Sequence, residues 1–259
     1  MSPRRKRDSA GRTTGAPRRV GWRLWLRRTA MALGVFLLLP VPAILLFSVV
    51  DPPITAVMLA RAGSRLMDGI RPVFPRHTPV SRAQQSPRLR RAVLASEDDR
   101  FYLHFGIDTL ELRKALERRR QGGRLRGAST LTQQVAKNIF LWNGRSYVRK
   151  GLEVYLTLWL ELLLSKERIL DLYINLAEWG PDEFGAEAGA QRHFRTSAAA
   201  LTREEAARMA AILPAPRRWS PKGNIATRRA AVILERMNYP APRELPETSP
   251  SSRRRAQRR

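Results

Sequence analysis

The sequence predicts a mainly α-helical domain that follows one N-terminal transmembrane helix. Residues 29–50 carry no charge and follow a basic N-terminus, whereas the later segments place apolar residues at the three-to-four-residue spacing of amphipathic helices. Strand patterns are scarce. Of the 259 residues, 43% are hydrophobic, which is enough for a buried core and excludes wholesale disorder.

The uncharged run 29–50 is long enough to span a bilayer, because a membrane core needs about 20 apolar residues in a helix. Pro40 and Pro42 predict a kink in it. A buried core helix and a cleaved signal peptide are the alternatives. A signal peptide has a shorter apolar region and a small-residue cleavage site, which residues 49–53 do not offer. Residues 1–28 contain ten Lys or Arg and one Asp, so the N-terminus is expected in the cytoplasm and residues 51–259 outside.

Composition and helical periodicity divide the chain into five segments. We expect a basic cytoplasmic segment 1–28, a transmembrane anchor 29–50, a juxtamembrane segment 51–75, a folded domain 76–238 and a disordered Pro- and Arg-rich tail 239–259. Within the domain, periodicity predicts helices at 87–103, 107–121, 129–141, 146–165, 166–177, 183–193, 202–213 and about 225–237. Thr202 and Glu205 form a capping box at the start of one helix, and Leu213-Pro214 ends it.

The net charge of +26 predicts an anionic partner, which is nucleic acid, anionic lipid or a phosphate-bearing substrate. The absence of cysteine excludes disulfides, thiolate metal sites and cysteine nucleophiles, and three histidines argue against a His-rich metal site. Gly-rich nucleotide motifs and the G-x-S-x-G elbow are absent too, so no nucleotide cofactor is expected.

Two segments combine polar side chains with helix ends. Glu97, in ASEDDRFYLHFG, follows an apolar turn, where a carboxylate with a raised pKa suits acid–base chemistry; the alternative is an exposed acidic turn. In GASTLTQQVAKN, Thr130 and Gln133 predict a capping box. The free N–H groups at that helix start, with Lys137 two turns on, would suit a phosphate. The alternative is an ordinary capped helix after a flexible glycine loop.

Two further segments are less specific by themselves. Arg149 and Glu153 have the i,i+4 spacing of a helical ion pair. Glu153, Thr157 and Glu161 form a polar stripe on an otherwise apolar helix, which costs free energy unless the stripe faces a cleft or finds partners. Residues 166–180 read only as an amphipathic helix that ends at a glycine.

These segments together resemble the peptidoglycan glycosyltransferase family (glycosyltransferase family 51), whose members make glycan strands from lipid II. The patterns E-D-x-x-F-x-x-H-x-G, G-x-S-T-x-T-Q-Q-x-x-K-N, R-K-x-x-E and K-x-x-I-L-x-x-Y-x-N occur in this order. Arg229, with Ile233-Leu234, is similar to a fifth motif, R-x-x-x-V-L, with Ile in place of Val. The resemblance covers about residues 87–237 and implies a lysozyme-like, two-lobed fold without a transpeptidase domain, as in the monofunctional members.

The resemblance also implies a reaction and roles. A growing lipid-linked glycan is transferred with inversion onto the GlcNAc 4-hydroxyl of lipid II, and undecaprenyl pyrophosphate is released. Glu97 would be the catalytic base, and Glu153 would position the pyrophosphate, with Mg²⁺ or Mn²⁺ as the candidate metal there. The implied substrate-binding residues are Ser129, Thr130, Gln133, Gln134, Lys137, Asn138 and Arg149. The residues expected to hold the motif architecture are Asp98, Phe101, His104, Gly106, Lys150, Tyr173, Asn175 and Arg229.

The expected location is the inner (cytoplasmic) membrane, with a single pass and a periplasmic catalytic domain. The expected partners are lipid II, the growing glycan strand, the membrane and the cell-wall synthesis machinery, and no nucleic acid. Three other readings remain: a lytic cell-wall enzyme of the same fold, an inactive scaffold, and a membrane-tethered nucleic-acid binder. Trp22 and Trp25 would serve the last, but they also lie where interfacial anchors occur.

Overall fold

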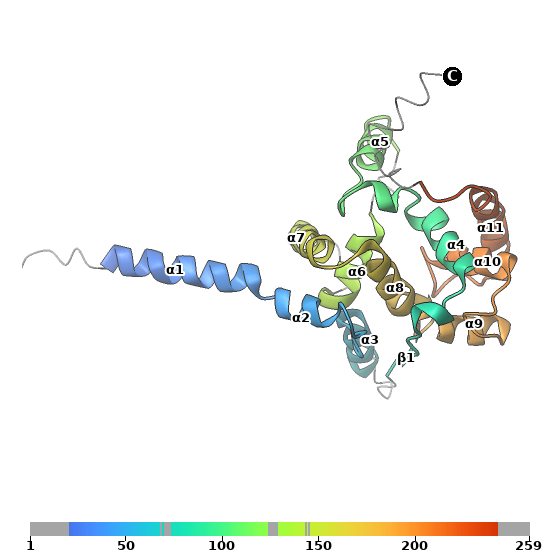
Figure 1. Ribbon diagram of the computed structural model, residues 1–259, viewed down its shortest axis with the longest axis horizontal. Helices are drawn as coiled ribbons and strands as arrows, with labels where there is room; N and C mark the ends of the chain where they lie inside the picture. Colours follow the sequence, from blue (N-terminus) through green and yellow to red (C-terminus); the bar gives the residue numbers. More distant parts are fainter. Residues whose placement is uncertain are drawn as a thin grey trace, which may run out of the picture. The chain divides into compact units, whose positions relative to one another are not determined.

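The computed structural model describes residues 21–67, 69, 74–123, 129–142, 144 and 146–242. Residues 1–20 of the predicted basic segment 1–28 and residues 243–259 of the predicted tail 239–259 therefore lie outside the described residues. The chain divides into two units, residues 1–40 and 41–259, which are described separately. The mainly α-helical class predicted from the sequence is confirmed (Figure 1).

In the first unit, α1 (Gly21–Leu38) is an apolar helix with mostly exposed side chains. It ends just before Pro40, and a second helix, α2 (Val41–Leu46), starts after it, so the interruption predicted from the two prolines is present. The stretch Trp22–Leu46 is long and apolar enough to cross a membrane, with a mean hydropathy of 2.3. Only 11% of its most apolar window is buried, which disfavours the buried-core-helix alternative.

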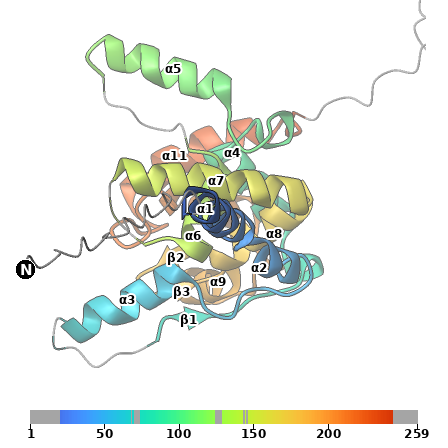
Figure 2. The ribbon, with the colours of Figure 1, turned by 90° about the vertical axis from the view of Figure 1, so that its left-hand side faces the viewer.

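The second unit is built around α8 (Lys166–Leu176), whose residues from Ile169 to Leu176 are all buried. α6 (Leu131–Phe140) packs against α8 and against α7 (Tyr147–Leu163), and α10 (Arg203–Ile212) packs between α4 (Pro87–Glu97) and α11 (Asn224–Arg236). Figures 1 and 2 both place α6 between α7 and α3 (Ala56–Met67). The helix start predicted at Thr202 has the full capping box with Glu205.

One predicted helix is shorter than its periodicity suggested. Residues 87–103 do not form a single helix, because α4 ends at Glu97 and the chain continues through Asp98 into a short 3₁₀ turn, η2 (Phe101–Leu103). The Asp98 carboxylate accepts hydrogen bonds from the Leu131 backbone N–H and from His104. These partners fix Asp98 outside the helix, so Glu97 becomes the last residue of α4.

The remaining elements complete the unit. α5 (Thr109–Arg120) is capped at its N-terminus by the Asp108 side chain. α9 (Ala186–Phe194) begins three residues later than predicted, because 183–184 belong to a strand. That strand, β3 (Glu183–Phe184), lies between β1 (Arg76–His77) and β2 (Glu178–Gly180), parallel to β1 and antiparallel to β2.

The helix α3 lies in the segment 51–75, for which the sequence predicted no helix. Its Val57 and Met58 form a small buried cluster with Phe184. Two ion pairs attach the same helix to the sheet. Arg61 pairs with Glu178 of β2, and Arg65 pairs with Asp182 in the turn between β2 and β3. These contacts hold α3 against the domain, next to α6.

Candidate active site

Glu97 lies at the C-terminal end of α4 and lines a cavity of about 430 Å³. Desolvation raises the pKa of its carboxyl group above the ordinary value, and two hydrogen bonds to the carboxylate partly oppose that rise. Gln134 Nε2 donates to Oε2 at 3.1 Å and Ser96 Oγ donates to Oε1 at 3.1 Å. A half-buried carboxyl with a raised pKa beside a cavity has the properties of a general base.

Gln134 connects Glu97 to Tyr173 across the interior. The Tyr173 hydroxyl donates to Gln134 Oε1 at 3.3 Å, which leaves the Gln134 amide to face the Glu97 carboxylate. Burial raises the pKa of Tyr173 well above its ordinary value, so the hydroxyl keeps its proton and acts as a donor. Tyr173, expected to hold the architecture, therefore fixes the orientation of a residue that touches the candidate base.

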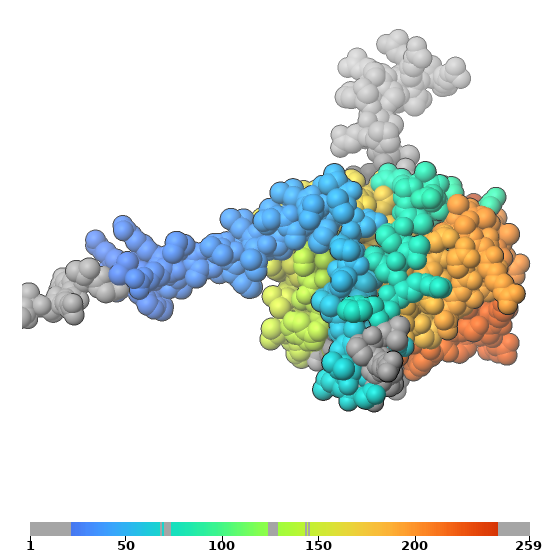
Figure 3. All heavy atoms as spheres, turned by 90° about the horizontal axis from the view of Figure 1, so that it is seen from below, coloured from blue at the N-terminus to red at the C-terminus, as the bar shows by residue number. Residues whose placement is uncertain are grey.

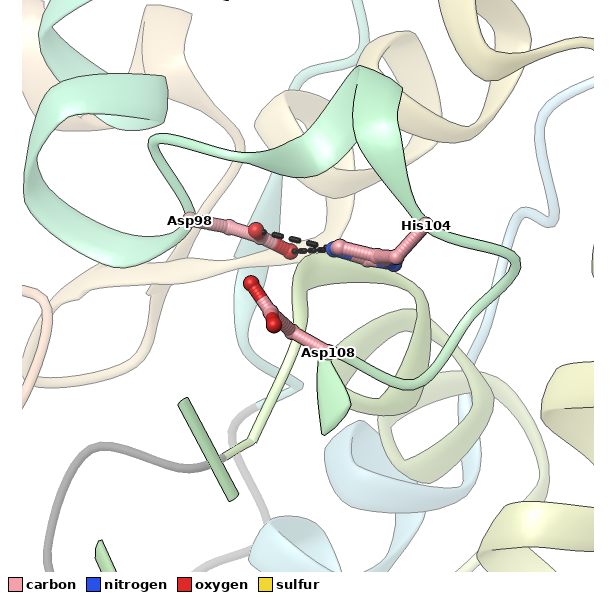
Figure 4. A group of neighbouring side chains, drawn as sticks. All are labelled: Asp98, His104 and Asp108. Carbon is pink, nitrogen blue, oxygen red and sulfur yellow. Dashed lines mark hydrogen bonds and ion pairs between the residues drawn. The ribbon is translucent and has the colours of Figure 1, made fainter. Parts of the chain in front are cut away.

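Asp98, His104 and Asp108 form a compact group, and their potential ligand atoms lie within 4.8 Å of one another (Figure 4). Each is already engaged. Asp98 accepts from His104 Nε2 at 3.0 Å and from the Leu131 N–H, and Asp108 caps α5 and accepts from Arg100 Nε at 3.1 Å. The group is therefore a hydrogen-bonded brace between the end of α4 and the starts of α5 and α6.

Two neighbours of this brace are also tightly placed. Phe101 is fully buried, and the Lys166 ammonium lies 4.4 Å from its ring centre. Gly106 has φ +75°, and a Cβ there would lie 2.5 Å from the Thr157 methyl, so the position requires glycine. The Gly106 carbonyl accepts from Thr130 Oγ1 at 2.7 Å.

The start of α6 is capped differently from the prediction. Thr130 Oγ1 accepts from the Gln133 N–H, as expected, but the Gln133 side chain does not complete a capping box. Its Oε1 instead accepts from Lys150 Nζ at 3.0 Å, and Lys150 also reaches the exposed Ser129 hydroxyl at 3.4 Å. Lys150, expected to hold the architecture, thus lies among the predicted substrate-binding residues.

The polar stripe on α7 is buried and fully partnered. Glu153 accepts from Arg149 at 2.6 Å through one oxygen and from Lys150 through the other. The Thr157 hydroxyl donates to the Glu153 carbonyl, and Glu161 accepts from Thr132 and Lys166. The stripe was predicted to need a cleft or partners, and it has the partners.

These contacts bear on the metal expected at Glu153. Both Glu153 oxygens are held by cationic side chains, and a divalent cation in the same place would compete with two positive charges. The residues around Glu153, as arranged here, do not fit a metal ion. The Mg²⁺ or Mn²⁺ expected at Glu153 stays a prediction.

Lys137 lies on α6, and its charge interacts with both candidate carboxylates, Glu97 and Glu153. Attraction to Glu153 and to Glu97 raises the pKa of Lys137 and repulsion from Arg149 lowers it, but the largest cause is burial, which leaves the pKa below its ordinary value. No hydrogen bond from the Lys137 ammonium is found among the described residues. Its charge is therefore available to a ligand.

The three other predicted residues, Asn138, Asn175 and Arg229, lie in different parts of the domain. Asn138 lines a second, smaller cavity together with Lys137. Asn175 is buried, and its amide joins the Val80 backbone to Asp51. Arg229 donates to the Ala211 carbonyl and lies close enough to Glu97 for its charge to lower the pKa of that carboxyl.

The structure also adds a residue that sequence analysis missed. Arg61 of α3 lines the second cavity beside Lys137 and Asn138. It lies in the segment 51–75 and matches no motif. The only available signal was the helical spacing of apolar residues over 56–67, which places the arginine on a helix but not near α6.

Comparisons with known proteins show which family the chain resembles. A family model described as transglycosylase matches residues 68–238. A curated protein of Pseudomonas syringae pv. syringae, named biosynthetic peptidoglycan transglycosylase, is 44% identical over 231 residues, covering 88% of this chain and 98% of that protein. A protein of the same name from Pseudomonas fluorescens is 45% identical over 219 residues, with coverages of 83% and 90%.

Proposed function

The chain belongs to the transglycosylase family and is a peptidoglycan glycosyltransferase that polymerises glycan strands, and from this premise we propose how its residues divide the reaction. Glu97 accepts the proton of the attacking hydroxyl. Lys137, Arg149 and Lys150 receive the negative charge of the leaving group. The observation that carries the proposal is the Glu97 carboxylate, which lines the cavity and accepts hydrogen bonds from Gln134 and Ser96.

In the proposed reaction the acceptor is the GlcNAc 4-hydroxyl of lipid II, and it lies in the 430 Å³ cavity beside Glu97. As its oxygen bonds to the anomeric carbon of the lipid-linked glycan, its proton passes to the Glu97 carboxylate. The bond from that carbon to the pyrophosphate oxygen breaks with inversion. Glu97 must be ionised to accept the proton, so its raised pKa brings the base closer to the working pH.

The leaving pyrophosphate gains negative charge as its bond to the sugar breaks, and preorganised cations lower the energy of that transition state. Arg149 and Lys150 are held by Glu153, which keeps their charges in place at the start of α7. Ser129 lies within reach of Lys150 and can donate to a phosphate oxygen. A lytic enzyme, which releases no pyrophosphate, would have no need of this set of cations.

The helix Trp22–Leu46 supports a membrane location. In this proposal it anchors the chain once in the inner (cytoplasmic) membrane, with the N-terminus in the cytoplasm and the catalytic domain in the periplasm. The ten Lys and Arg of residues 1–28 support that orientation. Because both substrates carry polyprenyl tails, the anchor limits the search for them to two dimensions. The cell-wall synthesis machinery stays a predicted partner.

The test compares polymerisation of labelled lipid II by the full-length protein and two variants, Glu97→Gln and Glu111→Gln. Glu111 is the matched control, because it is a carboxylate that lines the same cavity, belongs to no motif and, within the described part of the chain, forms an ion pair with Lys114 alone. We expect polymer from the wild type and from Glu111→Gln, and none from Glu97→Gln at an unchanged melting temperature. Normal polymerisation by Glu97→Gln would disprove its role as base. Shortening of preformed glycan by the wild type would favour a lytic enzyme.

A further inference from the structure

A second cavity, of about 190 Å³, lies on the side of α6 that faces α3. α6 contributes Gln134, Lys137 and Asn138 to its wall, α3 contributes Arg61, and β2 contributes Glu178. Figure 3 shows the light-blue surface of α3 beside the lime surface of the segment that contains α6. The motif residues of α6 therefore face a helix that belongs to none of the sequence motifs.

Arg61 is only partly satisfied within this cavity wall. Its Nη2 donates to Glu178 Oε2 at 3.0 Å, whereas its Nε is buried without a hydrogen-bond partner among the described residues. A guanidinium has five N–H donors, and a buried donor without an acceptor is unfavourable. The Arg61 guanidinium therefore has hydrogen-bonding capacity that its ion pair with Glu178 does not use.

The charges of the residues around the cavity indicate which hydrogen-bond acceptor it can bind. Arg61 and Lys137 contribute two positive charges, and Glu178 contributes one negative charge. That carboxylate is itself occupied, because Glu178 Oε1 accepts from the Asp182 N–H and lies 3.8 Å from Arg217 Nε. A guanidinium and an ammonium on one wall favour an oxyanion.

We propose that Arg61 is a further substrate-binding residue, which together with Lys137 holds an oxyanion of the lipid-linked substrate in the cavity between α3 and α6. The oxyanion is a phosphate of the pyrophosphate or a carboxylate elsewhere in the same substrate. This inference rests on the proposed function, because it takes Lys137 as part of the substrate site. Arg61 contacts the substrate before the reaction, so its loss should raise KM. If the oxyanion is a phosphate of the leaving pyrophosphate, kcat should fall as well, whereas a carboxylate remote from the breaking bond should leave kcat nearly unchanged.

The experiment measures KM and kcat for lipid II with full-length Arg61→Gln, using Arg65→Gln as the matched control. Arg65 lies one turn later on α3 and also forms an ion pair, with Asp182, but it does not line the cavity. Each variant therefore loses one positive charge and one ion pair from the same helix. We expect KM to rise roughly ten-fold in Arg61→Gln, the typical effect of losing one charge-assisted hydrogen bond, and to stay near the wild-type value in Arg65→Gln.

Two further measurements separate loss of binding from loss of folding and identify the oxyanion. Arg61→Lys keeps the positive charge on α3, so it should fold as the wild type does and recover part of the loss in KM. Inhibition by inorganic pyrophosphate identifies the oxyanion. If the inhibition constant rises together with KM in Arg61→Gln, the cavity holds a phosphate, and if only KM rises, it holds a carboxylate.

An unchanged KM in Arg61→Gln, or an equal rise in Arg65→Gln, would overturn the inference. Neither result affects the proposed function, which is contradicted only if the wild type makes no polymer or Glu97→Gln polymerises normally. The two failures are therefore distinguishable in the same set of assays.

Discussion

Replacing Gln134 with methionine should move the acidic limb of the pH–rate profile upward. The change keeps a side chain of similar length but removes the hydrogen bond from Gln134 Nε2 to the Glu97 carboxylate. That bond stabilises the ionised form of Glu97, so its loss raises the pKa of the carboxyl further. Since the base acts only when ionised, activity at low pH should be lost at a higher pH than in the wild type.

The size of the shift follows from the value of one such bond. A hydrogen bond to a charged group contributes about 1.5–3 kcal/mol, and about 1.4 kcal/mol corresponds to one pKa unit. Ser96 still donates to the other oxygen of Glu97, and water can reach the cavity side, so the lower end of this range applies. We expect the acidic limb of kcat/KM to move up by about one pH unit.

The assay is polymerisation of labelled lipid II over a series of pH values, with kcat/KM taken at each. Tyr173→Phe is the control, because it removes the bond from Tyr173 to Gln134 but leaves the Gln134–Glu97 bond intact, so its acidic limb should stay in place. A limb that does not move in active Gln134→Met, or that moves to lower pH, would refute the assignment of that limb to Glu97.

Four further changes test the electrostatics and the packing. Burial lowers the pKa of Lys137, so kcat/KM should fall at alkaline pH as the Lys137 charge is lost. In Lys137→Arg, which stays charged, this fall should occur at a higher pH. A fall at the same pH as in the wild type would contradict the role of Lys137 in binding the leaving group. Gly106→Ala combines φ +75° with a contact of 2.5 Å to Thr157, and should lower stability by about 1–3 kcal/mol in thermal unfolding. Gly151→Ala, whose Cβ meets nothing within 4 Å in α7, should instead raise stability by about 0.5–1 kcal/mol. Thr130→Val removes the cap of α6 and should cost about 1–2 kcal/mol in denaturant unfolding; no loss would show that the cap is dispensable.

Local signals in the sequence predicted most helices within a few residues. α10 is an example, because the capping box at Thr202 and the Leu213-Pro214 pair both act within one turn of its ends. The break after Glu97 could not be predicted in this way. It depends on Asp98 accepting a hydrogen bond from Leu131, 33 residues later, and no local pattern reports such a contact. The strands are two or three residues long, too short for a period of two to be visible.

In the candidate site too, the sequence predicted individual residues but not the contacts between them. The motifs named Glu97, Gln134 and Lys137, but the hydrogen bond between Glu97 and Gln134 spans 37 residues and is visible only in the folded chain. Arg61 could not be found from motifs at all, because its place beside Lys137 depends on how α3 packs on α6.

The segment that follows α2 is bound directly to the central helix of the domain. The Phe47 carbonyl accepts from Arg168 Nε at 2.8 Å, and Asp51 pairs with Arg168 at 2.7 Å and accepts from Asn175 at 2.5 Å. In the proposed membrane arrangement, residues 47–51 are thus a short connection that is held against the domain by these contacts. Any movement of the catalytic domain relative to the anchor would then have to arise on the N-terminal side of Phe47, because the contacts from Phe47 to Asp51 tie this segment to α8.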